Sequence, residues 1–161
     1  MDWKPLYDYC RSLRMKVLIL FLLGFSPALT DWQHDIEKAK QEAKQDHKVI
    51  LLNFSGSDWC IPCINMEKEI FEHSEFKAYA EKHLVLMRAD FPRLKKNALA
   101  RDLQLNNEVL AEKYNQKGAF PFTLLLDSDG KVLKSWEGKP EVSTAEFINQ
   151  IRATVDNVKW E

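Results

Sequence analysis

Two of the chain's three cysteines lie three residues apart in the segment SDWCIPC, which runs from Ser57 to Cys63. A pair at this spacing can form a structural disulfide, supply half of a metal site, or act as an exchange pair. An apolar run over residues 49–54 precedes the pair, and apolar residues at helical spacing follow it from Pro62. We therefore expect Cys60 at the start of a helix, where unpaired N–H groups and the helix dipole stabilise a thiolate.

The residues around the two sulfurs suit a reactive pair. Cys63 lies one helical turn after Cys60, so it can attack a mixed disulfide formed on Cys60 and release the partner. Cys60 is thus expected as the nucleophile and Cys63 as the resolving thiol. Pro62 suits a first helical turn, where one N–H can be spared, and Trp59 would shelter the site with a flat apolar surface.

Three other interpretations stay open for the same pair. A structural zinc site needs four ligands, and no paired ligand spacing is found among His34, His47, His73 and His83. A structural disulfide between residues i and i+3 closes a very short loop, so it restrains the unfolded chain little. A binding or assembly module without turnover would keep the pair as such a disulfide. An ordinary thiol pKa and an activity that survives Cys60→Ser would indicate this module.

Length and composition predict one ordinary folded unit. The chain has 161 residues, a net charge of -1 and no basic stripe, so nucleic-acid binding is not expected. No bound cofactor is implied, because the electrons of an exchange reaction reside in the cysteine pair itself. We expect a monomer.

The beginning of the chain has the composition of an export signal. Met15 and Lys16 precede an apolar run over residues 17–25, and small residues follow this run up to Ala28. A charged start, a short apolar segment and a small-residue cleavage region are typical of a signal peptide. The apolar run is shorter than the ~20 residues that a membrane span requires.

We therefore predict a leader and signal peptide over residues 1–28, with Met15 as a candidate true start, and a folded domain over residues 29–161. An exported, periplasmic location follows, with secretion and membrane anchoring as alternatives. Removal of the leader would also remove Cys10. The two remaining cysteines would then be the only thiols in an oxidising compartment.

Apolar spacing predicts alternating helices and strands and hence an α/β fold, a central mixed sheet flanked by helices. The charged segment 91–105 is expected as a loop with a short helix, and serves either as a recognition insertion or as a longer connection. The predicted order is helix, strand, helix, helix, strand, helix, strand, strand, helix. The helices are expected to begin near Thr30 or Asp31, Pro62, Ser74, Asn106 or Asn107, and Ser143 or Thr144, and the strands to cover residues 49–54, 84–90 and both sides of Asp129-Gly130.

The segment WCIPC resembles the tryptophan-plus-CxxC motif of the thioredoxin superfamily, and the resemblance extends over residues 32–155. It implies a thioredoxin-like fold. It also implies a cis-proline opposite the cysteines, at Pro121, and a backbone at Phe120 that pairs with an extended substrate segment. On the segments FSGSDWC, KEIF and LAEKYNQKGAFPF, the chain resembles small exported thioredoxin-like proteins and the thiol-exchange domain of membrane-linked disulfide reductases.

The chain departs from cytosolic thioredoxins at a position that matters for proton transfer. Asn53 stands where that family carries a buried Asp, and an amide cannot take a proton. Another group must then accept the proton of Cys63. Glu67, one helical turn further on, and Asp58, near the motif, are the candidates for a proton relay, with a surface role as the alternative for each.

The sequence therefore predicts a thiol–disulfide oxidoreductase that reduces or exchanges disulfides in exported client proteins. An upstream thiol reductant, such as a membrane disulfide reductase, would have to regenerate the dithiol. The Pro in the central dipeptide resembles the reducing members of the family. Direction depends on the reduction potential, in which about 30 mV corresponds to about 1.4 kcal/mol.

Overall fold

A computed structural model describes residues 31–158 of the chain. The predicted leader, with Met15 and Cys10, lies outside these residues, and so does the predicted helix start at Thr30. Within residues 31–158, no helix is both long enough and apolar enough to cross a membrane.

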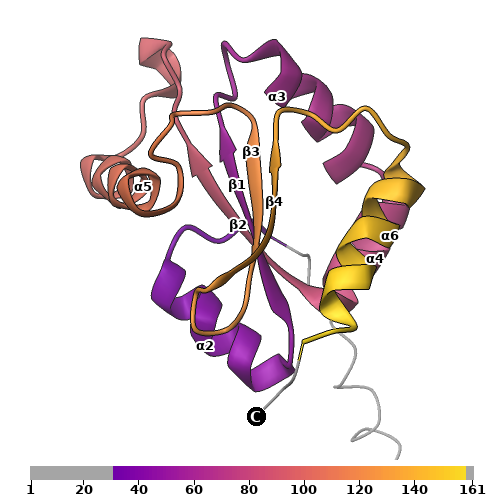
Figure 1. Cartoon of the computed structure of the whole chain (residues 1–161). Helices are drawn as coiled ribbons and strands as arrows, with labels where there is room; N and C mark the ends of the chain where they lie inside the picture. The colour runs from indigo at the N-terminus through magenta and orange to yellow at the C-terminus, as the bar shows by residue number, and fades with distance from the viewer. Residues whose placement is uncertain (1–30, 159–161) are drawn as a thin grey trace, which may run out of the picture.

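A four-stranded mixed sheet lies at the centre of the molecule, in the order β2-β1-β3-β4 (Figure 1). β1 pairs with β2 in parallel and with β3 antiparallel, and β3 pairs antiparallel with β4. Every residue of β1 is buried, as its almost continuous apolar sequence predicts for a strand covered on both faces. The strands are β1 Val49–Ser55, β2 Leu84–Asp90, β3 Phe122–Leu126 and β4 Val132–Glu137.

Helices cover both faces of this sheet, with α2 and α5 on one side and α3, α4 and α6 on the other (Figure 1). The observed order of elements is the predicted one. The helices are α2 Ile36–Asp46, α3 Ile61–Met66, the π-helix η1 Glu67–Phe71, α4 Ser74–His83, the short 3₁₀-helix η2 Lys95–Asn97, α5 Arg101–Tyr114 and α6 Thr144–Val155.

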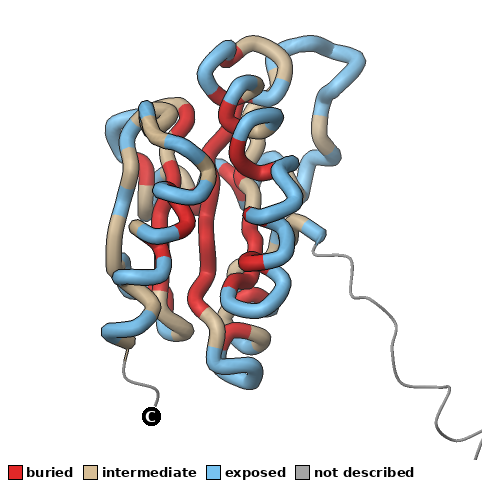
Figure 2. Tube along the Cα trace, turned by 90° about the vertical axis from the view of Figure 1, so that its right-hand side faces the viewer, coloured by how far each residue is buried: buried red, intermediate tan, exposed pale blue. Residues whose placement is uncertain are grey.

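Side chains of β1 point alternately into two hydrophobic cores. Val49 and Leu51 pack with residues of α3, η1, α4 and α6, whereas Ile50, Leu52 and Phe54 pack with residues of α2 and α5. This alternation is the period of two that a strand imposes on its side chains. The buried residues accordingly run through the middle of the molecule (Figure 2).

The strand register brings three chain segments to one edge of the sheet. Ser55, the last residue of β1, pairs with Asp90, the last residue of β2, and the N–H of Phe91 donates to the Ser55 carbonyl at 2.8 Å. Phe122, the first residue of β3, pairs with Phe54 on the other side of β1. The chain after β1, the chain after β2 and the chain before β3 therefore meet at this edge.

The first helix begins later than the sequence predicts. Its cap is Asp35, whose side chain accepts hydrogen bonds from the N–H groups of Glu37 and Lys38, so the prediction of a start near Asp31 is wrong. The preceding residues are extended instead, because Gln33 forms a bridge with Met87 on the outer side of β2. A backbone pairing thus takes precedence over the helical pattern.

The prediction that Asn106 or Asn107 begins a helix is also wrong, because α5 begins at Arg101. Asn107 is buried inside the helix, and its side-chain amide donates to the backbone carbonyl of Asp90 at 2.8 Å. An Asn in a helix can meet the need of a distant backbone group in this way. The connection after β2 is consequently shorter than expected and spans residues 91–100. At α4, the cap is His73 rather than Ser74.

The buried amide of Asn107 predicts a specific loss of stability. Asn107→Ala removes the donor to the Asp90 carbonyl and should lower the free energy of unfolding by about 1–3 kcal/mol, measured by urea denaturation. Asn106→Ala, at the exposed neighbouring position, gains the same helix propensity and is the matched control. Equal stabilities of the two variants would contradict the assigned role.

Candidate active site

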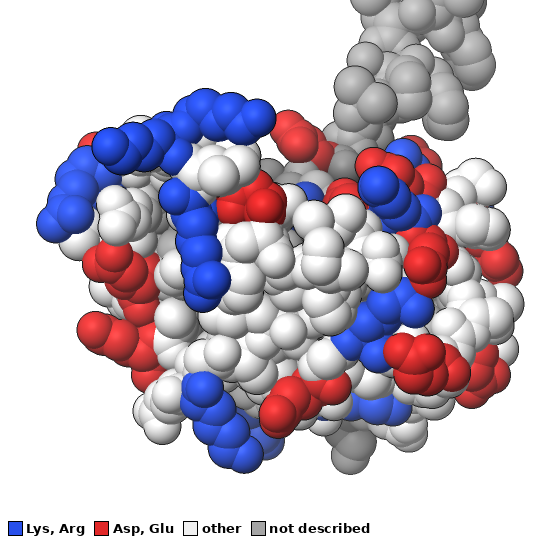
Figure 3. Space-filling model, turned by 90° about the horizontal axis from the view of Figure 1, so that it is seen from above, with Lys and Arg blue, Asp and Glu red and all other residues white. Residues whose placement is uncertain are grey.

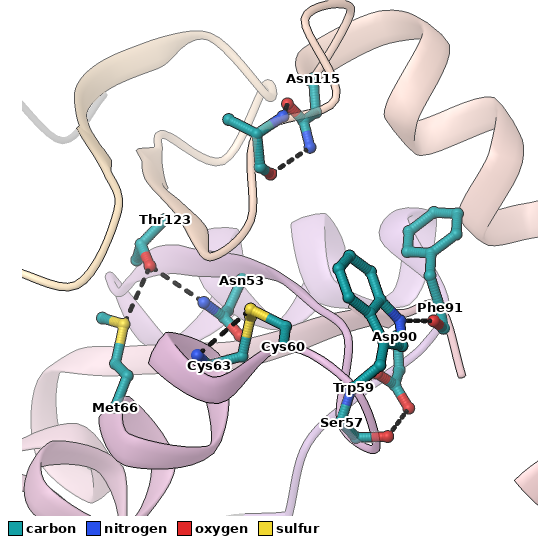
Figure 4. The surroundings of a disulfide bond; sticks show 11 residues. Asn53, Ser57, Trp59, Cys60, Cys63, Met66, Asp90, Phe91, Asn115 and Thr123 are labelled. Carbon is teal, nitrogen blue, oxygen red and sulfur yellow. Dashed lines mark hydrogen bonds between the residues drawn. A yellow bond between two sulfur atoms is a disulfide. The ribbon is translucent and has the colours of Figure 1, made fainter. Parts of the chain in front are cut away.

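Cys60 and Cys63 form a disulfide, with an S–S distance of 2.08 Å and a Cα–Cα distance of 5.2 Å (Figure 4). The two residues are only 5% and 4% exposed. Cys60 immediately precedes α3, and its Sγ accepts a hydrogen bond from the N–H of Cys63 at 3.3 Å. The prediction of Cys60 at a helix start is confirmed. A fixed N–H donor at this sulfur favours the thiolate once the bond is reduced.

The helix after the cysteines is not regular throughout. Pro62 lies in its first turn, as expected, and the helix passes at Glu67 into the π-helix η1. π-helical turns are rare in proteins as a whole, but those that occur often lie at functional sites. Ile61, between the two cysteines, is 65% exposed and thus presents an apolar side chain beside the disulfide.

Trp59 is held in place on several sides. Its indole N–H donates to the carbonyl of Phe91 at 2.7 Å, and its ring meets that of Phe120 edge to face at 5.4 Å between centroids. Gly56 lies directly against the indole, since a Cβ on Gly56 would come within 2.4 Å of a ring atom. The structure thus brings together Trp59 and Phe120, which are 61 positions apart in the sequence.

The peptide bond between Phe120 and Pro121 is cis. Asn115 fixes Ala119, the residue before Phe120, through two hydrogen bonds. Its side-chain amide donates to the Ala119 carbonyl and its side-chain oxygen accepts from the Ala119 N–H, both at 2.9 Å. The Pro121 carbonyl accepts from the N–H of Gly138 at 2.8 Å. Within the part of the chain that the structure describes, no hydrogen bond involves the backbone of Phe120.

A neutral network lies next to the disulfide (Figure 4). The side-chain amide of Asn53 donates to the hydroxyl oxygen of Thr123 at 3.0 Å, and this hydroxyl donates to the sulfur of Met66 at 3.9 Å. All three residues are buried. Asn53 therefore brings no ionisable group into the core beside the cysteines, as its amide side chain implies.

Glu67 shares a small pocket with Cys63. The pocket has a volume of about 130 Å³, and its walls include Cys63, Glu67 and Arg88. This volume is large enough to admit water. The carboxylate of Glu67 forms an ion pair with the Arg88 guanidinium, which also lies over the ring of Trp32 at 3.9 Å. The structure thus gives Glu67 a fixed position at an opening that reaches the second cysteine.

Asp58 has a different set of partners. Its carboxylate accepts from the N–H groups of Arg93 at 2.9 Å and Leu94 at 3.0 Å, and from the side-chain amide of Asn97 at 2.9 Å. The Arg93 N–H is the main cause that lowers the pKa of Asp58, with help from Asn97 and Leu94. The structure therefore places Asp58 as an anchor for the chain after β2.

Sequence reasoning missed two residues that fix the site. Asp90 accepts from both the N–H (2.9 Å) and the hydroxyl (2.5 Å) of Ser57, and so holds the segment before the motif. The sequence signal for Asp90 is that a polar residue ends the buried strand β2, which is parallel to β1. The second residue is Asn115, three positions before Gly118, where the sequence indicates a turn but not the bonds to Ala119.

No metal site accompanies the cysteines in the described residues. Among residues 31–158, no group of three or more His, Cys, Asp or Glu side chains lies close enough to hold a metal ion.

Comparison with known proteins decides the family. The family model described as thioredoxin-like matches residues 31–128. The chain belongs to the thioredoxin-like family. Within it, the chain is 36% identical over 124 residues to the disulfide bond reductase DsbH of Chlamydia pneumoniae, a match that covers 77% of this chain and 72% of that protein.

Two further comparisons support the thioredoxin-like fold and chemistry. A solved structure of a DsbH oxidoreductase superimposes with a TM-score of 0.71 at 31% identity, covering 85% of this chain and 94% of that one. The thioredoxin-related protein DsbJ of Chlamydia pneumoniae is 29% identical over 116 residues, which are 65% of this chain but 33% of that protein. With its cysteine pair at a helix start, this thioredoxin-like chain is a thiol–disulfide oxidoreductase.

The close approach of Gly56 to Trp59 predicts a test of the site's packing. Gly56→Ala should force the indole away from Phe91 and lower the free energy of unfolding by about 1–3 kcal/mol, the usual cost of overpacking. Its disulfide-reductase rate should fall as well. In a Trp59→Leu background, the methyl group meets none of the indole atoms, so the same substitution should cost much less. An equal cost in both backgrounds would show that the indole is not what limits position 56.

Proposed function

We propose that this oxidoreductase reduces or exchanges disulfides in exported client proteins. The observation that carries the proposal is the Cys60–Cys63 pair at the start of α3, with the Cys63 N–H directed at the Cys60 sulfur. In the reduced protein, the Cys60 thiolate attacks one sulfur of a client disulfide and releases the other as a thiolate. The Cys63 thiolate then attacks Cys60, which frees the second client sulfur and forms the Cys60–Cys63 disulfide.

This sequence of steps moves two electrons from the chain to the client. An upstream dithiol must therefore restore the cysteine pair, and in an exported protein a membrane disulfide reductase could supply these electrons. The Chlamydia pneumoniae relative is named a disulfide bond reductase, which supports the reducing direction. The apolar run before Ala28 supports export to the periplasm.

The surroundings of the cysteines supply the groove for the client. Trp59 and Phe120 form adjoining aromatic walls, and the backbone of Phe120 keeps its N–H and carbonyl for an extended client segment. Pro121 and the two bonds from Asn115 hold that backbone in place. A client strand can pair there through main-chain hydrogen bonds, which accept many side-chain sequences.

Glu67 is assigned the proton relay for Cys63 in this scheme. Cys63 must lose a proton before it can attack the mixed disulfide, and the neutral Asn53 cannot accept one. Glu67 opens onto the same pocket as Cys63, so the proton can pass through water. Arg88 holds the carboxylate as a positioning residue.

Removal of the resolving thiol should trap clients. Cys63→Ser leaves Cys60 able to attack, so mixed disulfides should accumulate on it and disappear on treatment with dithiothreitol, measured by gel mobility and mass spectrometry. The trapped partners should come from the extracytoplasmic fraction. Cys60→Ser is the matched control and should trap none. A chain that traps no partner as Cys63→Ser would instead be a binding module with a structural disulfide.

Replacement of the relay should slow the second step alone. Glu67→Gln should lower the rate of resolution by about tenfold or more, a modest share of a general base's contribution. Single-turnover mixing with a peptide disulfide separates attack from resolution. Glu72→Gln changes another carboxylate on the same pocket and should leave both rates unchanged. An unchanged rate of resolution in Glu67→Gln would remove Glu67 from the mechanism.

A further inference from the structure

The connection that follows β2 is strongly basic. Residues 91–101, named here the basic loop, read FPRLKKNALAR and hold four basic residues and no acidic one. The whole chain is balanced, with 23 basic and 24 acidic residues, so this excess is local. Three of the four cations are Arg93, Lys95 and Lys96, and the fourth is Arg101 at the start of α5.

The basic loop is fixed beside the cysteine motif. Asp58, two residues before Cys60, accepts three hydrogen bonds from the loop, and Trp59 donates to the Phe91 carbonyl. The Arg93 guanidinium also lies over the Trp59 ring at 3.6 Å. The loop is thus attached to the site itself, as a wall of a binding surface would be, rather than only passing near it.

The charges of the loop face solvent without acidic partners. Arg93, Lys95 and Lys96 are exposed, and none of them forms an ion pair with another of the residues 31–158. Leu94, among them, is 48% exposed. Seen from above, basic side chains gather on the left of a largely uncharged face, the side on which Figure 1 places this loop (Figure 3). A largely uncharged surface beside the cysteines therefore has a cationic margin.

We propose that the basic loop recognises acidic residues of the client, about two to four positions from the cysteine that Cys60 attacks. Asp58 and Cys60 are two residues apart, hence at most about 7 Å along the chain, and an extended client rises about 3.3 Å per residue. The long side chains of Lys95 and Lys96 reach further. The proposal rests on the proposed function and names its substrate class: extended, acidic segments next to a disulfide.

Such recognition acts through exposed charges, so it has a defined dependence on salt. Complementary charges raise the rate of encounter at low ionic strength. The effect falls as the screening length shrinks from about 10 Å at 0.1 M to about 3 Å at 1 M salt. A preference that arises from shape or from apolar contact would keep its size over this range.

The test uses three cyclic peptides, each closed by one disulfide and identical except for tails of three Asp, three Ser or three Lys placed from the second position beyond a cysteine. The reduced full chain is mixed with each peptide, and the rate of peptide reduction is followed by chromatography. At low salt, the Asp peptide should react about fivefold faster than the Ser peptide and the Lys peptide more slowly than both. At 1 M salt the three rates should converge.

Matched charge-reversal variants locate the effect. Lys95→Glu with Lys96→Glu should abolish or invert the preference while the rate on the Ser peptide stays the same. Lys77→Glu with Lys131→Glu makes the same change in net charge at exposed positions on α4 and in the β3–β4 turn, and should keep the preference. Urea denaturation of both variants confirms that each is folded.

The outcomes separate this proposal from the proposed function. If the chain reduces none of the peptides, the reductase assignment fails. If it reduces all three at equal rates, the assignment stands and acidic recognition is overturned. A third outcome is equal rates together with binding of the chain to vesicles of phosphatidylserine and phosphatidylcholine, measured by sedimentation. If the Lys95→Glu, Lys96→Glu variant loses this binding, the basic loop recognises an anionic membrane surface, and acidic client recognition is again overturned.

Discussion

The site depends on the pairing of β1 with β2 on one side and with β3 on the other. This register places the end of β1, the end of β2 and the start of β3 at one edge of the sheet. A slip of one residue would turn the side chains of β1 to the opposite cores. Because β1 contributes buried side chains to both cores, the slip is costly, and the cysteine motif and the cis-proline segment stay side by side where the Trp59 and Phe120 rings meet.

The electrostatics beside the cysteines follow from one substitution in the core. Asn53 is bonded to Thr123, and no Asp or Glu is among the buried residues of the range 31–158, so no buried carboxylate of this range opposes a thiolate beside the disulfide. In the proposed mechanism the acid–base group lies on the surface side of the motif, where Glu67 is paired with Arg88. Proton transfer in this chain would then take place at a solvated pocket rather than in the core. The transferred proton would therefore be open to buffer and to exchange with solvent deuterium.

Local chemistry made much of this structure predictable from sequence. The order of elements, the position of Cys60 before α3 and the bond from Glu146 N–H to the Ser143 hydroxyl all follow from short-range patterns. Two of the failures share one cause, which is a hydrogen bond to a partner distant in sequence. Asn107 lies mid-helix and its side-chain amide donates to the carbonyl of Asp90, and Gln33 is extended because its backbone pairs with β2. Single residues carry no sign of such partners, so an Asn there resembles an ordinary cap or turn.

The extended residues ahead of α2 have a consequence for the outer strand of the sheet. The backbone of Gln33 donates to Leu86 at 2.8 Å and accepts from Arg88 at 3.0 Å, so it occupies hydrogen-bonding groups that β2 would otherwise leave open. Exposed strand edges invite pairing with other chains. This short stretch therefore protects the edge at β2 against pairing with other chains. The other edge strand is β4, on which a foreign strand could extend the sheet.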